Sequence, residues 1–275
     1  MQLNAYPAIG NWSVLPSWIP VPDMGALPVN SFLLKGDEPM LMDTGVSATG
    51  PEFLEELASR IDPADLRWIW LSHMDADHIG NLERVLNAAP RAGIITNFLG
   101  MGKLNLAGFD IGRVHLLNSG DELEINGHRL RPVRPAYYDA PETIGFYDAT
   151  DGVLFSADSF GALFECPVAS LDEVPAALLR DGMQIWSSID APWLSDTDPE
   201  AFARTLAAID RLDPAIVLSS HLPLVRKGAG RLTRILAEGR AHVSAAAPDP
   251  LHLTQLAAAF ASHAGSEERN TSCPA

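Results

Sequence analysis

The feature that most constrains this sequence is an apolar run, Trp68–Leu71, that leads into a dense group of potential metal ligands. His73, Asp75, Asp77 and His78 fall within six residues. Positions 73, 75 and 77 project to one side of an extended chain, because side chains alternate along a strand. Imidazole and carboxylate ligands together suit iron, manganese and zinc. The pattern predicts ligands for two adjacent metal ions rather than an acidic helix cap, since helix caps seldom need two histidines and two aspartates together.

Two further apolar runs end in possible ligands. Val153–Phe155 is followed by Asp158, and Ile216–Leu218 is followed by His221. Each has an ordinary explanation when taken alone, because an aspartate after a strand is usually a turn former and a histidine there is usually a polar cap. Three such strand ends in one chain favour a shared metal site.

Short apolar runs alternate with amphipathic helical patterns along the rest of the chain. The predicted strands are Asn30–Leu34, Pro39–Met42, Arg67–Leu71, Gly93–Thr96, Arg113–Leu117, His128–Val133, Ile144–Tyr147, Val153–Phe155 and Ala215–Leu218. The predicted helices are Pro51–Arg60, Asn81–Ala88, Leu171–Ile185, Pro199–Asp210, Gly230–Arg240 and Leu251–His263. Two blocks of strands, each followed by helices, favour an α/β fold of two stacked β-sheets flanked by helices, an αββα sandwich. A doubly wound nucleotide-binding fold is weakened because no G-x-G-x-x-G motif follows the first strand.

The two ends of the chain depart from this alternation. Residues 1–30 are rich in proline and predict an extended lead-in with one edge strand. Residues 265–275 are polar and predict a flexible tail. We therefore expect a single domain over residues 1–264.

Composition and charge argue against several classes of function. The 275 residues include 19 Lys or Arg and 35 Asp or Glu, which gives a net charge of −16. Binding to nucleic acid or to an anionic membrane needs clustered basic residues, so neither is expected. No apolar run reaches the roughly 18 residues of a membrane span. Because the N-terminus also lacks a signal-peptide pattern, we expect a cytoplasmic protein.

The three strand ends together resemble the metallo-β-lactamase superfamily. The motif His-x-Asp-x-Asp-His at 73–78, the later Asp158 after Leu-Phe-Ser, and the final Ser-His221 carry the resemblance. Within the superfamily, four stretches look most like the β-lactamase-like domain of flavodiiron and related oxygen-binding diiron proteins: 29–33, 40–45, 62–66 leading into His73, and 154–161. The resemblance covers roughly residues 30–224, and it implies the αββα fold with a dinuclear site at the sheet edge.

Carried over residue by residue, the resemblance implies a ligand set. One metal would be held by His73, Asp75 and a ligand from the 135–142 loop. The other would be held by Asp77, His78 and His221, with Asp158 bridging the two. Asp43 matches the position of a carboxylate that orients a ligating imidazole.

The chain departs from the family at two positions. The commonest superfamily motif has a histidine where this chain has Asp75; flavodiiron-type members carry a carboxylate there, normally glutamate. The family usually supplies a histidine from the 135–143 loop, which contains none. Spacing selects Asp139 as the replacement, while Tyr138 and Glu142 stay possible.

Three imidazoles and four carboxylates favour a harder ion such as iron over a histidine-rich dizinc site. We expect two metal ions, with iron favoured over zinc or manganese, and no flavin bound in this chain. Asp77 and Tyr138 are the candidate catalytic residues.

The resemblance implies a diiron protein that binds or reduces dioxygen or nitric oxide, or that oxidises a small substrate. Without a flavodoxin domain, electrons would come from a separate donor protein, and relatives often form homodimers. The alternative is a metal-dependent hydrolase of an ester, thioester, lactone or amide that acts through a metal-bound hydroxide. A non-enzymatic sensor of oxygen or nitric oxide is a third interpretation, and a nuclease is disfavoured because a basic channel is not expected.

Overall fold

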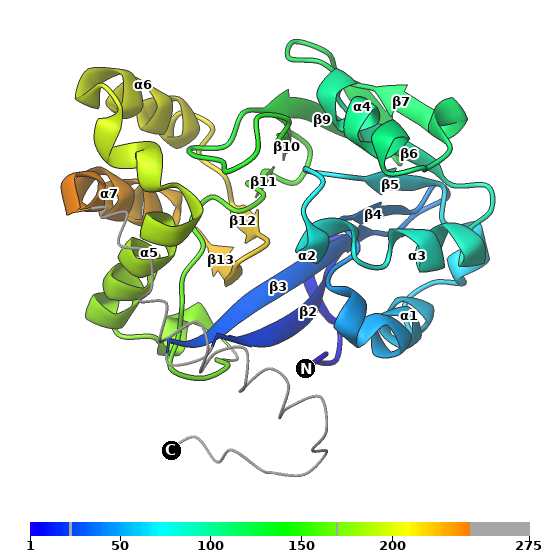
Figure 1. Cartoon of the computed structure of the whole chain (residues 1–275), viewed down its shortest axis with the longest axis horizontal. Helices are drawn as coiled ribbons and strands as arrows, with labels where there is room; N and C mark the ends of the chain where they lie inside the picture. The colour runs from blue at the N-terminus through cyan, green and yellow to red at the C-terminus, as the bar shows by residue number, and fades with distance from the viewer. Residues whose placement is uncertain (22–23, 169, 243–275) are drawn as a thin grey trace.

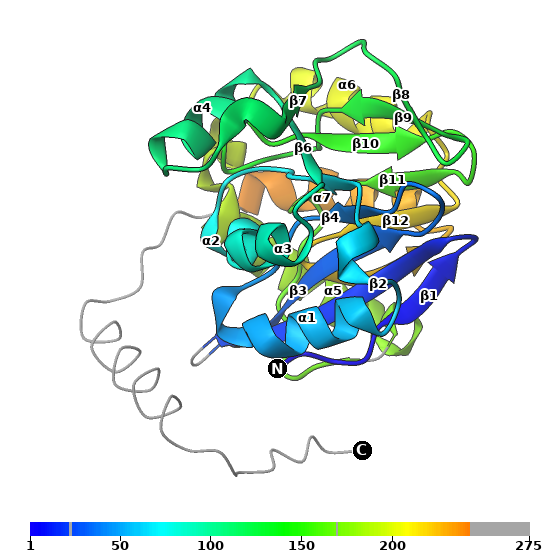
Figure 2. The same ribbon diagram turned by 90° about the vertical axis from the view of Figure 1, so that its right-hand side faces the viewer.

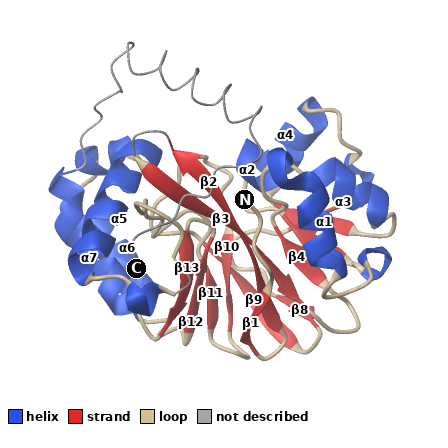
Figure 3. Ribbon diagram, turned by 90° about the horizontal axis from the view of Figure 1, so that it is seen from below, coloured by secondary structure: helices blue, strands red, loops and turns tan. Residues whose placement is uncertain are grey.

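Two β-sheets stack face to face, and helices cover both outer sides (Figures 1 and 3). The computed structural model describes residues 1–21, 24–168 and 170–242. Helices α5, α6 and α7 lie on one side of the strands, and α1 to α4 lie on the other (Figure 1). In the turned view, α1 and α3 lie in front of the strands of the first sheet (Figure 2). The predicted αββα sandwich is confirmed.

The first sheet runs in the order β1-β2-β3-β4-β5-β6-β7, antiparallel up to β4 and parallel from β4 onward. Its strands are β1 Tyr6–Ile9, β2 Trp12–Val21, β3 Gly25–Leu34, β4 Met40–Met42, β5 Trp68–Trp70, β6 Gly93–Thr96 and β7 Val114–Leu116. The second sheet runs in the order β13-β12-β11-β10-β9-β8, and only its β11–β12 pair is parallel. Its strands are β8 Leu123–Ile125, β9 His128–Val133, β10 Gly145–Asp148, β11 Val153–Phe155, β12 Ile216–Ser219 and β13 Leu222–Arg226.

Helices fill the connections between the strands. The α-helices of the described ranges are α1 Gly50–Ala58, α2 Ala76–Ile79, α3 Leu82–Ala88, α4 Phe98–Leu106, α5 Ala176–Asp190, α6 Pro199–Asp210 and α7 Ala229–Gly239. Short 3-10 turns occupy Ser47–Thr49, Pro63–Asp65, Ile111–Arg113, Leu171–Glu173, Pro192–Asp196 and Arg240–His242. Across these ranges, no helix has both the length and the apolar character of a membrane span.

The alternation of side chains along each strand builds the layers. In β3, Phe32 and Leu34 face the second sheet, while Leu33 faces the helices α1 and α3. In β4, Met40 faces the second sheet and Leu41 faces the helices. Both faces of these strands are therefore apolar, as expected for a sheet that is covered on both sides.

All nine predicted strands correspond to observed strands, but the predicted N-terminal lead-in is wrong. β2 and β3 are ten residues each and form a continuous antiparallel hairpin. Pro16 lies opposite Asn30, and Pro28 lies opposite Trp18. The amide of Asn30 donates away from the hairpin, to the carbonyl of Ser220. The prolines therefore occupy positions whose N–H the β2–β3 ladder does not need. The proline content of residues 1–30 wrongly predicted a lead-in segment where the chain forms long paired strands.

Other boundaries differ for local reasons. Helix α4 was not predicted, because Gly100 and Gly102 lower its helix propensity. The helix predicted over Leu171–Ile185 begins only at Ala176, since Pro175 disfavours a helical conformation in the residue before it. β8 and β13 were also missed. The helix predicted over residues 251–263 and the tail predicted over 265–275 lie outside the described residues, so the domain limits stay a prediction.

Candidate metal centre

The predicted site residues all follow strands of the two sheets and meet at one edge of the sandwich. The connection between β5 and α2 carries His73 and Asp75, and α2 itself carries Asp77 and His78. Asp158 follows β11, and His221 lies between β12 and β13. Asp139 comes from the connection between β9 and β10. Both sheets therefore contribute ligand candidates to the same place.

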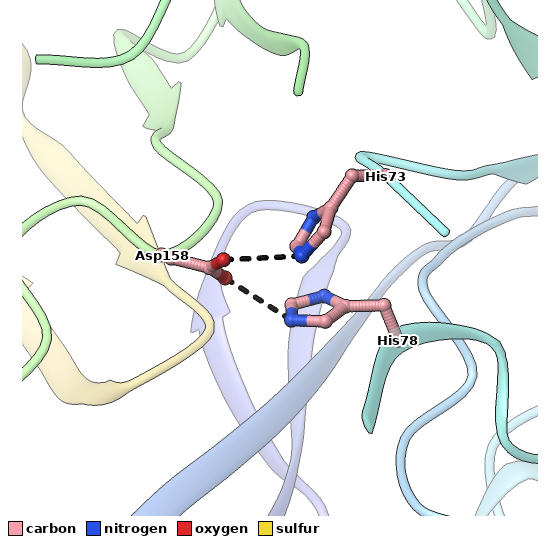
Figure 4. A group of neighbouring side chains, drawn as sticks. All are labelled: His73, His78 and Asp158. Carbon is pink, nitrogen blue, oxygen red and sulfur yellow. Dashed lines mark ion pairs between the residues drawn. The ribbon is translucent and has the colours of Figure 1, made fainter. Parts of the chain in front are cut away.

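Asp158 lies at the centre of the cluster, between three imidazoles. Its Oδ2 is 3.1 Å from Nε2 of His73, and its Oδ1 is 3.1 Å from Nε2 of His78. Figure 4 shows both rings directed at this carboxylate from the β5–α2 segment. Nε2 of His221 lies 3.3 Å from the same Oδ1. All four side chains are at most 2% exposed.

Two groups of side chains flank Asp158, one on each side. Oδ2 of Asp77 is 3.5 Å from Nε2 of His78 and 3.4 Å from Nε2 of His221. On the other side, Oδ1 of Asp139 is 3.8 Å from Nε2 of His73. Three ligand atoms, one from each of His73, Asp75 and Asp139, all lie within 4.8 Å of one another. The seven predicted ligands are thus brought together in the predicted two groups, while their binding of metal stays a prediction.

A layer of hydrogen bonds fixes the rings from behind. Nδ1 of His78 lies 2.9 Å from Oδ2 of Asp43, and Nδ1 of His221 donates to the carbonyl of Pro28 over 2.8 Å. The hydroxyl of Ser72 donates to Asp43 over 2.7 Å and lies 3.0 Å from Nδ1 of His73. Each ring is thereby held through Nδ1, which leaves Nε2 free to bind a metal.

The buried atoms at the centre of the cluster lack partners. Nε2 of His73, Nε2 of His78 and Oδ1 of Asp158 are buried without a hydrogen bond of acceptable geometry. Unpaired polar groups are unfavourable in a protein interior. A bound cation would satisfy all three atoms, so the residues present fit a metal centre.

The close approach of Asp158 and the three histidines also shifts their pKa values. Burial alone would raise the pKa of Asp158, but His73, His78 and His221 outweigh it and hold that pKa well below its usual range. Burial would lower the pKa of His221, but the Asp158 carboxylate raises it to about 9. The pKa of His78 is likewise raised well above its usual value, because Asp158 and Asp77 outweigh its burial.

Three residues beside the cluster have strained backbone conformations. Asp43, Ala157 and Phe160 adopt left-handed φ values of 56°, 48° and 73°. Such values are uncommon for residues other than glycine and often mark functional sites. Here they turn the chain sharply after β4 and β11, and so aim Asp43 and Asp158 into the cluster.

The two other candidates from the 135–143 loop are directed elsewhere. The hydroxyl of Tyr138 accepts a hydrogen bond from Arg134, and its ring lies 5.5 Å from that of Trp193. Glu142 is fully buried and forms an ion pair with Lys103. These contacts favour Asp139 over Tyr138 and Glu142 as the ligand from this loop. The catalytic role of Tyr138 stays a prediction.

Sequence reasoning missed Tyr137 and Asp190, and it assigned Trp186 to the core rather than to the site. The Tyr137 hydroxyl donates to the carbonyl of Asp158 over 3.2 Å. The ring of Trp186 lies 4.9 Å from that of His221. Asp190 offers an oxygen within 4.8 Å of ligand atoms of Asp139 and Asp158. Burial and the Asp158 charge raise the pKa of Asp190 to about 8. The i, i+4 spacing of Trp186 and Asp190 puts them on one helix face but does not indicate which face.

Comparison with known proteins identifies the family. Residues 24–221 match the metallo-beta-lactamase superfamily. The anaerobic nitric oxide reductase flavorubredoxin of Salmonella arizonae is 31% identical over 140 residues, which cover 48% of this chain and 28% of that protein. The flavo-diiron protein FprA2 of Clostridium acetobutylicum is 26% identical over 200 residues, which cover 72% of this chain and 49% of that protein. The chain therefore spans less than half the length of these two relatives.

A solved structure shows the same architecture. Rubredoxin oxygen:oxidoreductase from Desulfovibrio gigas superposes with a TM-score of 0.74 at 20% identity, over 87% of this chain and 61% of that one. This likeness concerns the fold. The sequence match covers more than half of the chain, as the resemblance of the strand ends predicted. The relatives include flavodiiron proteins, as the resemblance of the longer stretches predicted. The chain belongs to the metallo-beta-lactamase superfamily, with a domain like that of the flavodiiron proteins.

Proposed function

We propose that this chain is a diiron oxidoreductase that reduces dioxygen or nitric oxide. The observation that carries the proposal is the carboxylate of Asp158, buried between His73, His78 and His221 with ligand candidates on both sides. The names of two similar proteins, a nitric oxide reductase and an oxygen oxidoreductase, support the choice of substrate.

The residues divide into two ligand groups with one shared carboxylate. His73, Asp75 and Asp139 would hold one iron; Asp77, His78 and His221 would hold the other; Asp158 would bridge them. Four carboxylates against three imidazoles favour iron in its higher oxidation state. The irons, when bound, would supply the electrons that the substrate accepts.

The protein's own groups orient and enclose this centre. Asp43 and the Pro28 carbonyl keep two rings turned with Nε2 inward. Trp186 packs against His221 and excludes water from that side. The Asp77 side chain is 27% exposed and contacts two of the imidazoles. Burial would raise the pKa of Asp77, but His78 and His221 outweigh burial and lower that pKa. Asp77 would therefore serve the centre as an ionised ligand on its solvent side.

A metal-dependent hydrolase is the second candidate, because the superfamily match alone is compatible with it. Two metals would then lower the pKa of a bound water for attack on a carbonyl. The acidic ligand set is the observation that argues for redox chemistry instead.

A single-turnover experiment separates the two functions. The protein is loaded with Fe²⁺ under anaerobic conditions, freed of excess reductant and mixed with dioxygen or nitric oxide. We expect consumption of the gas together with oxidation of the iron, and loss of both in Asp139→Ala. A zinc-loaded protein that hydrolyses generic esters rapidly, while the iron form leaves both gases unconsumed, would overturn the proposal in favour of hydrolysis.

A further inference from the structure

We propose that Asp190, the last residue of α5, is an additional oxygen ligand of the metal centre on the side of Asp139. This inference rests on the proposed metal centre and extends it to a helix on the opposite layer of the sandwich. The α5 helix packs over the second sheet, whereas α2, which carries Asp77 and His78, lies on the side of the first (Figure 1).

The position of Asp190 is the first observation. One of its carboxylate oxygens lies within 4.8 Å of ligand atoms of both Asp139 and Asp158. Its Oδ2 is buried and has no hydrogen-bond partner. An unpaired carboxylate oxygen in a protein interior is strongly unfavourable unless a proton or a metal cation neutralises the group.

A second, independent observation comes from His73. This side chain is 1% exposed, and its Nε2 has no hydrogen-bond partner although it lies 3.1 Å from Asp158 and 3.8 Å from Asp139. A buried imidazole nitrogen without a partner therefore faces both of the carboxylates that Asp190 joins. A cation between them would satisfy the imidazole nitrogen and the carboxylates together.

The final turns of α5 are fixed against the centre. Trp186 lies one turn before Asp190, so the two side chains share a helix face. The Trp186 ring is 4.9 Å from that of His221. It packs so closely on Gly161 that a Cβ there would come within 2.4 Å of the ring. The same face that covers His221 thereby brings Asp190 to the Asp139 side.

The consequence is an asymmetric centre. The ion on the Asp139 side would have His73 with four carboxylates: Asp75, Asp139, Asp158 and Asp190. The other ion would have His78 and His221 with two carboxylates: Asp77 and Asp158. Oxygen-rich ligation favours harder ions, so we expect the iron on the Asp139 side to be the one held more strongly in the higher oxidation state.

The test compares Asp190→Asn with Asp181→Asn. Both substitutions remove one carboxylate from α5 without changing side-chain size, but the Asp181 side chain is 54% exposed and pairs with Arg180. Binding of Fe²⁺ is measured anaerobically by competition with a chelator, and the melting temperature of the metal-free proteins is measured in parallel. We expect Asp190→Asn to weaken one of two iron sites by tenfold or more, to spare the other, and to leave the metal-free melting temperature unchanged or raised. Asp181→Asn should match the wild type.

Two results would overturn the inference. If each iron site of Asp190→Asn binds iron as tightly as the same site of the wild type, Asp190 is not a ligand. A lowered metal-free melting temperature with both sites weakened alike would assign it a purely structural role. Should Asp190→Asn fail to fold, Asp190→Ser gives the same comparison. Failure of the wild type itself to bind two metals would instead refute the metal centre.

Discussion

The carboxylate of Asp43 offers a sharp test of how the site is supported. Asp43 is not among the proposed ligands, yet its Oδ2 lies 2.9 Å from Nδ1 of His78 and accepts a 2.7 Å hydrogen bond from Ser72. Asparagine has the same shape and tolerates the left-handed φ of 56° at this position. The Asp43→Asn substitution therefore changes the hydrogen bonding without disturbing the backbone.

The expected effect follows from the lost contact. In Asp43→Asn, one oxygen can still accept from the Ser72 amide, which lies 2.8 Å away. The new NH₂ group, however, faces Nδ1 of His78. Both groups are hydrogen-bond donors, so no hydrogen bond forms between them. The NH₂ group can still donate to the Ser72 hydroxyl, but the hydrogen bond between His78 and a charged group, worth about 1.5–3 kcal/mol, is lost. If that free energy orients the metal-binding form of His78, metal affinity falls about 10- to 150-fold, similar to the effects of other outer partners.

The assay is anaerobic Fe²⁺ titration in competition with a chelator. Asp148→Asn is the matched control, because Asp148 is also buried and lies 2.8 Å from Nδ1 of His128, in a pair outside the ligand cluster. We expect both substitutions to lower thermal stability but only Asp43→Asn to weaken metal binding. Unchanged iron affinity in Asp43→Asn, or an equal loss in Asp148→Asn, would refute the reasoning.

Three further predictions concern pH, the core and the 135–143 loop. His221 has a pKa raised to about 9, so its ion pair stabilises the metal-free fold fully below about pH 6.5 and is lost as pH rises through 9. The melting temperature in chelator should therefore fall from pH 6.5 to 9, and a rise would contradict the charge pairing. Phe146 is fully buried and contacts Trp12, Trp70 and Phe155; Phe146→Ala should lower the free energy of unfolding by about 3–5 kcal/mol in urea, and a loss below about 1 kcal/mol would show that the core relaxes. Asp139→Ala should lose one metal and keep its circular dichroism spectrum, whereas Tyr138→Phe should keep both metals; the reverse pattern would make Tyr138 the ligand.

Much of the fold and of the ligand cluster could be predicted from local patterns. The 73–78 motif, Asp158 and His221 each follow an apolar run, and the ends of these strands, from both sheets, meet at one edge of the sandwich. Asp139 lies in a loop and could be selected only because its spacing is close to the intervals of the family that the chain resembles; the structure directs its carboxylate toward His73. The other residues are recognisable because strand and ligand are adjacent in sequence.

The remaining site residues could not be predicted because tertiary packing decides their position. Asp190 ends a helix whose direction depends on how α5 lies on the second sheet. Tyr137 and Tyr138 are neighbours with identical side chains; only the fold places the hydroxyl of Tyr137 on Asp158 and that of Tyr138 on Arg134. The β2–β3 hairpin was missed because its prolines suit strand positions that depend on register, which composition does not reveal.

The central claim is that these seven side chains hold two irons. The most direct measurement is the metal content of protein that is expressed and purified without oxygen and without added metal. We predict about two irons per chain, with near-ultraviolet absorption that appears on oxidation. Two zinc ions per chain, or no bound metal at all, would contradict the account.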